Sequence, residues 1–147
     1  MNAVLRPWFL SIATLALVGI VVSSVSLEHH FAKSKTSYCD FGESFNCDLV
    51  NRSPYSAVAG IPVALIGIAG YAAILALATL YRSKAETPAL LVLASGGGLV
   101  FALYLTYVEK FILQAWCILC LTSLTTILLI AVLSSILIAR YLRQVQS

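Results

Sequence analysis

Charged residues divide this chain into long apolar stretches. The uncharged segments cover residues 7–27, 53–81, 87–108 and 111–139. A helix needs about 20 apolar residues to cross the hydrocarbon core of a bilayer. The apolar parts of these segments predict transmembrane helices at roughly 7–27, 58–81, 88–108 and 115–139. The sequence therefore predicts an all-α membrane protein, a four-transmembrane-helix bundle formed by one domain over residues 1–147.

The connections between the predicted helices differ in length. Residues 82–87 and 109–114 form short loops, so the helices that they join are antiparallel neighbours. The loop between the first two helices is long, at 28–57, and holds most of the polar residues. The first apolar segment is longer than the 7–15 residues of a signal-peptide core, which favours a retained helix.

The composition fits a chain that lies in the lipid bilayer. Hydrophobic residues make up 61% of it and charged residues 10%, whereas soluble domains carry about a quarter charged residues. The net charge of +3 is spread along the chain, and no basic block indicates nucleic-acid binding. No predicted span contains a charged residue, which argues against a proton-coupled exporter.

The distribution of basic residues predicts the orientation. Cytoplasmic loops of membrane proteins carry an excess of Lys and Arg. With both termini inside, the inner side holds Arg6, Arg82, Lys84, Arg140 and Arg143, and the outer side holds Lys33, Lys35, Arg52 and Lys110. We therefore expect both termini in the cytoplasm and an extracytoplasmic long loop. All four cysteines then face the outer, oxidising side.

Cys117 and Cys120 form a C-x-x-C motif at the start of the last predicted helix. Their spacing places both sulfurs on one helical face, and the helix N-terminus favours a thiolate at Cys117. Inert packing and zinc binding are the alternatives. We expect no metal, because His29 and His30 do not have the spacing of a standard zinc site.

Cys39 and Cys47 lie in the long loop, with seven residues between them. Taken alone, this pair is equally consistent with a structural disulfide and with a redox pair. On the same membrane face as a C-x-x-C motif, they predict a relay, because thiolates exchange with disulfides through mixed disulfides. A lipid-soluble quinone is the electron acceptor available at the depth of Cys120.

Small residues gather in the third predicted helix, where Ser95 is followed by three glycines, 96–98. Small residues let membrane helices approach closely, so packing is the preferred interpretation. Room for a flat ligand is the other.

The combined motifs resemble a bacterial-type member of the vitamin K epoxide reductase family without the fused thioredoxin-like domain. Helix count and cysteine order agree over roughly residues 7–140. The matching stretches are Cys39-Asp40-Phe41-Gly42 through Cys47, Asn51-Arg52-Ser53-Pro54-Tyr55-Ser56, Gly60-Ile61-Pro62-Val63-Ala64-Leu65 and Cys117-Ile118-Leu119-Cys120.

The resemblance implies a role for each catalytic residue. Cys39 would meet the redox partner, and Cys47 would attack the Cys117–Cys120 disulfide at Cys117. Cys120 would face the quinone, and Ser53 would support the active site by hydrogen bonding.

Helical spacing extends this prediction to a quinone pocket. Leu124 lies one turn after Cys120, and a second face is formed by Ser56, Ala59 and Val63. Vertebrate members of the family have a tyrosine at the position of Leu124 and an asparagine at that of Ser56. Both hold the vitamin K oxygen there, so their replacement favours plain quinone reduction over epoxide reduction.

The predicted function is that of a quinone-dependent thiol–disulfide oxidoreductase. It would oxidise a separate thioredoxin-fold (DsbA-like) protein and reduce a quinone of the ubiquinone, menaquinone or vitamin K type, which supports disulfide-bond formation. The predicted location is a bacterial inner membrane with the cysteines facing the periplasm, or an ER membrane in a eukaryote. One alternative is a vitamin K or vitamin K epoxide reductase, and another is a non-enzymatic four-helix protein with structural disulfides.

Overall fold

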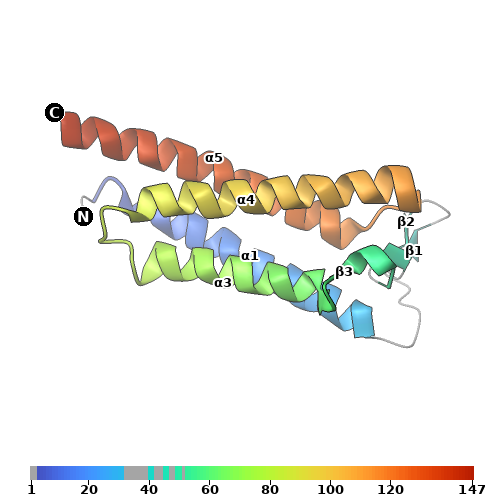
Figure 1. The fold of residues 1–147 in the computed structure, drawn as a ribbon. Coiled ribbons are helices and arrows are strands. Elements are labelled where there is room, and N and C mark those ends of the chain that lie inside the picture. The colour runs from blue at the N-terminus through green and yellow to red at the C-terminus, as the bar shows by residue number, and fades with distance from the viewer. Residues whose placement is uncertain (1–2, 32–39, 42–44, 47–48, 51) are drawn as a thin grey trace.

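The structure is a computed structural model of residues 1–147, and it describes residues 3–31, 40–41, 45–46, 49–50 and 52–147. Four helices form an elongated bundle (Figure 1). They are α1 (Arg6–Phe31), α3 (Val63–Thr79), α4 (Thr87–Val108) and α5 (Ile118–Gln146). The predicted all-α class with four apolar helices is confirmed.

Short elements occupy the end of the bundle opposite the two termini (Figure 1). Strands β1 (Asp40–Phe41) and β2 (Phe45–Asn46) form one antiparallel pair, and β3 (Ala57–Val58) and β4 (Ile61–Pro62) form another. A 3-10 helix, η1 (Pro54–Ser56), lies between the pairs, and a π-helix, η2 (Glu109–Leu113), continues α4. Because α5 begins at this end, the C-x-x-C motif and the segment that follows α1 meet there.

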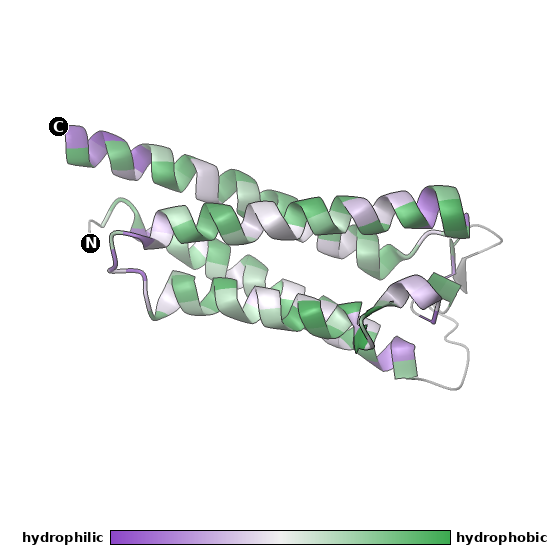
Figure 2. Cartoon of the chain, in the orientation of Figure 1, coloured by the Kyte–Doolittle hydropathy of each residue, from purple (hydrophilic) through white to green (hydrophobic). Residues whose placement is uncertain are grey.

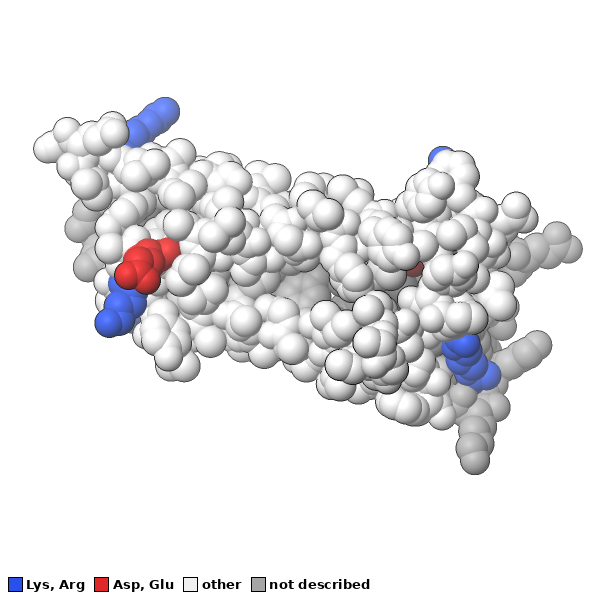
Figure 3. Space-filling view, viewed as in Figure 1, with Lys and Arg blue, Asp and Glu red and all other residues white. Residues whose placement is uncertain are grey.

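Three helical segments are long and apolar enough to cross a membrane: Arg6–Phe31, Thr87–Leu113 and Ile118–Gln146. The fourth, α3, is apolar but has 17 residues, at the lower limit for a spanning helix. Apolar side chains on the outside of the bundle are widely exposed, among them Leu93 at 71% and Val100 at 68%. Hydrophobic residues cover most of the helices in Figure 2, and the charges of the face in Figure 3 gather toward its two ends. A lipid environment accounts for this surface.

The helices pack through a mixture of large and small side chains. α1 packs against α3 and α5, and α4 packs mainly against α5. The interior includes Ile12, Leu91 and Ile130, each with no exposed surface. A Cβ atom on Gly19 of α1 would lie 2.4 Å from the ring of Tyr71 in α3, so the close approach of these two helices requires glycine there.

The second helix begins later than the predicted residue 58. Ala59 and Gly60 have positive φ values of 52° and 82°, and they form the turn between β3 and β4. A helix cannot continue through two left-handed residues. It begins instead at Val63, directly after Pro62, where a missing N–H group costs little.

The predicted loop 109–114 is largely helical. The π-helix η2 extends α4 through Leu113, and the chain then reverses at Gln114, which has left-handed φ and ψ values of 51° and 33°. The first and last helices are also longer than predicted, since α1 reaches Phe31 and α5 reaches Gln146. Polar residues at these ends extend the helices beyond their apolar parts.

Candidate functional site

The two cysteines of the C-x-x-C motif have different surroundings. Cys117 is the N-cap residue of α5 and has no exposed surface, whereas Cys120 is partly exposed. Cys120 is a free thiol in the structure. The Cys120 thiol forms a hydrogen bond with the Cys117 sulfur, and this bond lowers the pKa of Cys117 despite the opposing effect of burial. The sequence attributed a thiolate at Cys117 to the helix N-terminus, whereas the largest cause here is the bond from Cys120.

The segment before the motif brings Glu109 against it. After the reversal at Gln114, the N–H of Ala115 donates to the carbonyl of Glu109 at 3.1 Å. The N–H of Cys117 then donates to Oε2 of the same glutamate at 3.1 Å. The Glu109 side chain also interacts with the Cys120 thiol. One buried carboxyl group therefore contacts both members of the C-x-x-C motif.

The long loop approaches the motif from the other side. The N–H of Asn46 donates to the carbonyl of Trp116 at 3.0 Å, and Val50 packs with Ala115 and Cys117 in a small apolar cluster. Asn46 directly precedes Cys47 in the sequence, and Trp116 directly precedes Cys117. Cys39 and Cys47 themselves lie outside the described residues, so the predicted roles of the loop pair stay predictions.

Serine side chains hold the part of the loop that follows Val50. Ser53 Oγ donates to the Val50 carbonyl at 2.8 Å, and Ser56 Oγ donates to the Ser53 carbonyl at 2.7 Å. Ser56 Oγ also lies 3.2 Å from Nδ1 of His30 in α1, and Arg52 Nε donates to the carbonyl of His29 at 3.5 Å. These contacts bind the loop to the C-terminal end of α1.

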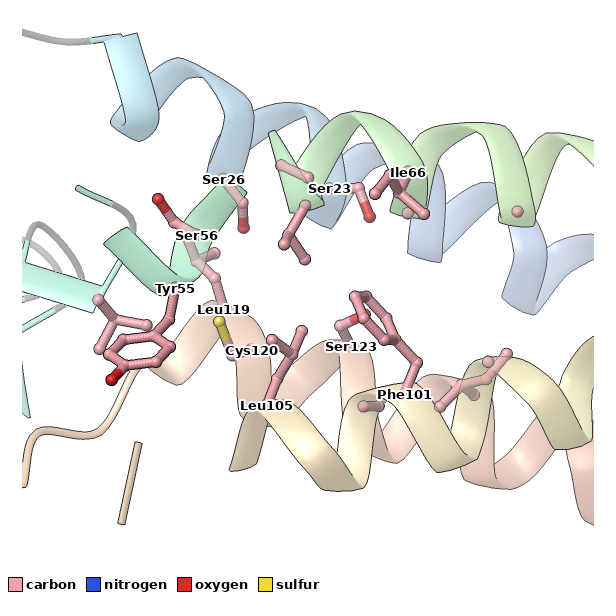
Figure 4. Close-up of a pocket in the computed structure, with 18 of the residues that line it drawn as sticks. Ser23, Ser26, Tyr55, Ser56, Ile66, Phe101, Leu105, Leu119, Cys120 and Ser123 are labelled. Carbon is pink, nitrogen blue, oxygen red and sulfur yellow. The ribbon is translucent and has the colours of Figure 1, made fainter. Parts of the chain in front are cut away.

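A cavity of about 360 Å³ lies beside Cys120 and is bordered by all four helices and the loop. Figure 4 shows Cys120 and Ser123 of α5, Phe101 and Leu105 of α4, and Ser23 and Ser26 of α1 around this space. Apart from a few hydroxyl groups, its walls are mostly apolar. The volume and character match small-molecule sites, which measure about 300–1,000 Å³ and carry few polar groups.

The structure brings only some of the predicted pocket residues to this cavity. Ser56, Val63 and Cys120 line it, whereas Ala59 and Leu124 are not among its lining residues. Ser53, which was predicted to support the active site, lines it as well. Ala59 belongs to the tight β3–β4 turn. On α5 the face toward the cavity runs through Cys120, Ser123 and Ile127, and Leu124 is displaced from that face.

For the small residues of α4 the sequence offered helix packing, the preferred interpretation, or room for a flat ligand. A Cβ atom on Gly98 would lie 3.2 Å from Ile127, so this position serves helix packing. Gly97 also borders the cavity, but a Cβ atom there would meet nothing within 4 Å. Gly97 therefore leaves open space in the cavity wall.

Sequence reasoning missed two polar residues of the site. Tyr71 borders the cavity, and its hydroxyl bonds to Ser123 of α5 through the carbonyl at 3.0 Å and Oγ at 2.9 Å. Glu109 was assigned to a loop, although it is 2% exposed and also borders the cavity. The signal for Glu109 was an acidic residue, paired in sequence with Lys110, in an otherwise apolar stretch that includes Val108 and Phe111–Leu113, shortly before a C-x-x-C motif.

Fold and site together define a helical membrane protein with a dithiol beside an apolar cavity. The model of the vitamin K epoxide reductase family matches residues 10–135, which is most of the chain. The chain belongs to this family, as its motifs predicted. No curated protein matches it. Membership supports an oxidoreductase of the membrane thiol–disulfide and quinone kind, or of the vitamin K epoxide reductase kind.

Proposed function

We propose that this protein is a membrane thiol–quinone oxidoreductase that oxidises a separate thioredoxin-fold protein and reduces quinone. The observation that supports this most strongly is the placement of the C-x-x-C motif between the loop and the cavity. Cys117 lies beneath the loop segment around Asn46 and Val50, while Cys120 lines the apolar cavity. Electrons that enter at the loop can therefore leave at the cavity.

The loop side is suited to disulfide exchange. The partner's dithiol would reduce a Cys39–Cys47 disulfide, and the Cys47 thiolate would attack the Cys117 sulfur of the Cys117–Cys120 disulfide. The S–S bond of the motif breaks, a mixed disulfide forms, and Cys120 leaves as a thiol or thiolate. Attack by Cys39 on Cys47 then restores the loop disulfide and leaves Cys117 and Cys120 reduced.

The cavity side fits a quinone as the electron acceptor. A quinone ring is flat and apolar except for its two oxygens, and it partitions into lipid. The cavity offers apolar walls, open space at Gly97 and hydroxyl groups on Ser23, Ser56 and Ser123. A bound quinone would take two electrons from the motif, and Cys120 is the thiol that borders its space.

The orientation proposed with this function places both termini in the cytoplasm and the loop end of the bundle outside. The termini lie together at one end of the bundle and the motif at the other (Figure 1). Reporter fusions after Lys84 and at the C-terminus should therefore read inside, and a fusion at Ser34 should read outside. Opposite readings would place the cysteines in the reducing compartment.

Quinone reduction by the purified protein in lipid nanodiscs tests the function. A reduced thioredoxin-fold protein supplies electrons, and we expect one quinol for each partner disulfide formed. Cys117→Ala and Cys120→Ala should each abolish quinol formation, while Leu129→Ala, a change at an exposed apolar position, should preserve it. Turnover with vitamin K epoxide but with none of the quinones would replace the proposal by epoxide reduction. No turnover with any acceptor would favour a structural role.

A further inference from the structure

Glu109 is a buried acidic residue that takes no part in the thiol–disulfide exchange steps proposed above. It is 2% exposed and lies where α4 continues into η2, after the buried Val108 and before the exposed Lys110. Burying an ionised carboxylate is costly unless it is fully paired. Ionisable groups inside membrane helices therefore point to function.

The contacts of Glu109 satisfy only half of its carboxyl group. Oε2 accepts the N–H of Cys117. Oε1 is buried and has no hydrogen-bond partner among the described residues. The carboxyl group also interacts with the Cys120 thiol and borders the cavity. Glu109 thus stands between a thiol that must lose a proton and a space in which a quinone would gain one.

We propose that Glu109 is the proton carrier between Cys120 and the quinone, an inference that rests on the proposed function. Oxidation of the reduced motif breaks two S–H bonds and forms one S–S bond, and two electrons pass to the quinone. Glu109 takes the proton of Cys120 and delivers it to one quinone oxygen in the cavity. The Cys117 proton leaves to water, and water supplies the proton for the second oxygen.

A merely structural role predicts different behaviour. As an acceptor for the Cys117 N–H, Glu109 would be replaced well by glutamine, whose side-chain oxygen also accepts a hydrogen bond but takes no proton at neutral pH. Glu109→Asp keeps the carboxyl group and shortens its reach. Glu86→Gln is the matched control, because Glu86 is an exposed glutamate at the other end of α4.

The first experiment measures quinone reduction in nanodiscs. Proton transfer by a positioned side chain contributes about 10²–10⁴-fold to a rate. We expect Glu109→Gln to lower kcat at least about tenfold with little change in the quinone KM and with unchanged Tm. Glu109→Asp should retain part of the rate, and Glu86→Gln all of it. Wild-type kcat in Glu109→Gln would overturn the proposal.

The second experiment needs no quinone. In a protein whose single thiol is Cys120, with Cys39→Ser, Cys47→Ser and Cys117→Ala, alkylation by a small apolar maleimide is followed by mass spectrometry. A base that removes the Cys120 proton makes alkylation depend on Glu109, so Glu109→Gln should slow it at least about tenfold. A carboxylate that acts only through its charge would oppose the thiolate, so Glu109→Gln would speed alkylation.

These two experiments separate the failure of this proposal from that of the proposed function. If the wild-type protein reduces no quinone, the proposed function fails, and the alkylation rates still decide whether Glu109 removes the Cys120 proton. Equal or faster alkylation in Glu109→Gln would overturn the assignment of Glu109 whatever the acceptor is.

Discussion

The two sides of the C-x-x-C motif are built differently. On the loop side, Cys117 is sealed beneath Val50 and Ala115, and its neighbour Trp116 is tied to Asn46 by a backbone hydrogen bond. On the cavity side, Cys120 borders a space of about 360 Å³ with mostly apolar walls. One side is closed by backbone contacts with a polar loop, and the other is open to a molecule from the membrane.

This difference suggests that mutations can impair the two half-reactions separately: oxidation of the partner on the loop side and reduction of quinone on the cavity side. Glu109 belongs to both sides, because it accepts the N–H of Cys117 and borders the cavity, and Val50 and Ser53 of the loop also line the cavity. Changes at residues that belong to one side alone should impair one half-reaction and spare the other. Variants that impair both half-reactions equally would contradict this division.

The largest effect is expected from Cys47→Ala on the loop side. The proposed relay needs a thiolate in the loop to attack Cys117, so oxidation of a thioredoxin-fold partner should stop. Small dithiols reach the motif without the loop pair and should still support quinone reduction. The measurement is quinol formation with each of the two electron donors.

The same variant tests the roles of the two loop cysteines. Without Cys47, the Cys39 thiolate can attack a partner whose single active-site cysteine is supplied as a mixed disulfide with a small aromatic thiol, which leaves as the free thiol. No second loop thiol is then present to resolve the new mixed disulfide, so a covalent complex should accumulate on non-reducing gels. Cys39→Ala with Cys47→Ala is the control, and it should form no complex. Normal partner oxidation by Cys47→Ala would remove the relay altogether.

The next largest effect is expected from Gly97→Leu on the cavity side. The added side chain would occupy open space in the cavity wall. Pocket contacts of this size are worth about 1–3 kcal/mol, so the quinone KM should rise about tenfold or more. Exchange between the loop pair and the motif, followed by acid quenching and thiol labelling, should keep its rate.

Gly96→Leu is the matched control for this substitution. Gly96 is the preceding residue of α4, and a Cβ atom there also meets nothing within 4 Å, but Gly96 does not border the cavity. Both variants carry the same helix-propensity change. Equal KM values in the two variants would show that the quinone does not occupy this cavity.

Sequence patterns were sufficient for the helices and for the motif, because both depend on local information. Uncharged stretches of spanning length and a C-x-x-C spacing need no tertiary contact to be recognised. The cavity depends on geometry instead. The turn at Ala59 and Gly60 and the π-helix after Val108 change where side chains point, and neither is visible in hydropathy. Ala59 and Glu109 were therefore placed differently by the sequence than by the structure. Leu124 was misplaced for another reason, because the cavity follows the face of α5 that carries Cys120, Ser123 and Ile127.

A smaller effect is expected from Ser53→Ala, which weakens the loop side. The lost hydrogen bond to the Val50 carbonyl is worth about 1 kcal/mol. The rate of exchange between the loop pair and the motif should fall about fivefold if this bond positions the loop. Ser135→Ala is the control, because Ser135 is an exposed residue of α5 that makes the same kind of bond to Ala131 at 2.8 Å.

The smallest effect concerns the pH at which Cys117 ionises. The hydrogen bond from Cys120 lowers the pKa of Cys117, against the opposing effect of burial. A protein with Cys39→Ser and Cys47→Ser has the two motif thiols alone, and its thiolate absorbance should begin to rise at a lower pH than for an ordinary cysteine, about 8.5. Adding Cys120→Ala removes the hydrogen bond, so the Cys117 midpoint should move to higher pH. A midpoint that stays in place or falls in this variant would show that Cys120 does not stabilise the Cys117 thiolate, and the helix N-terminus would then be its main source of stabilisation.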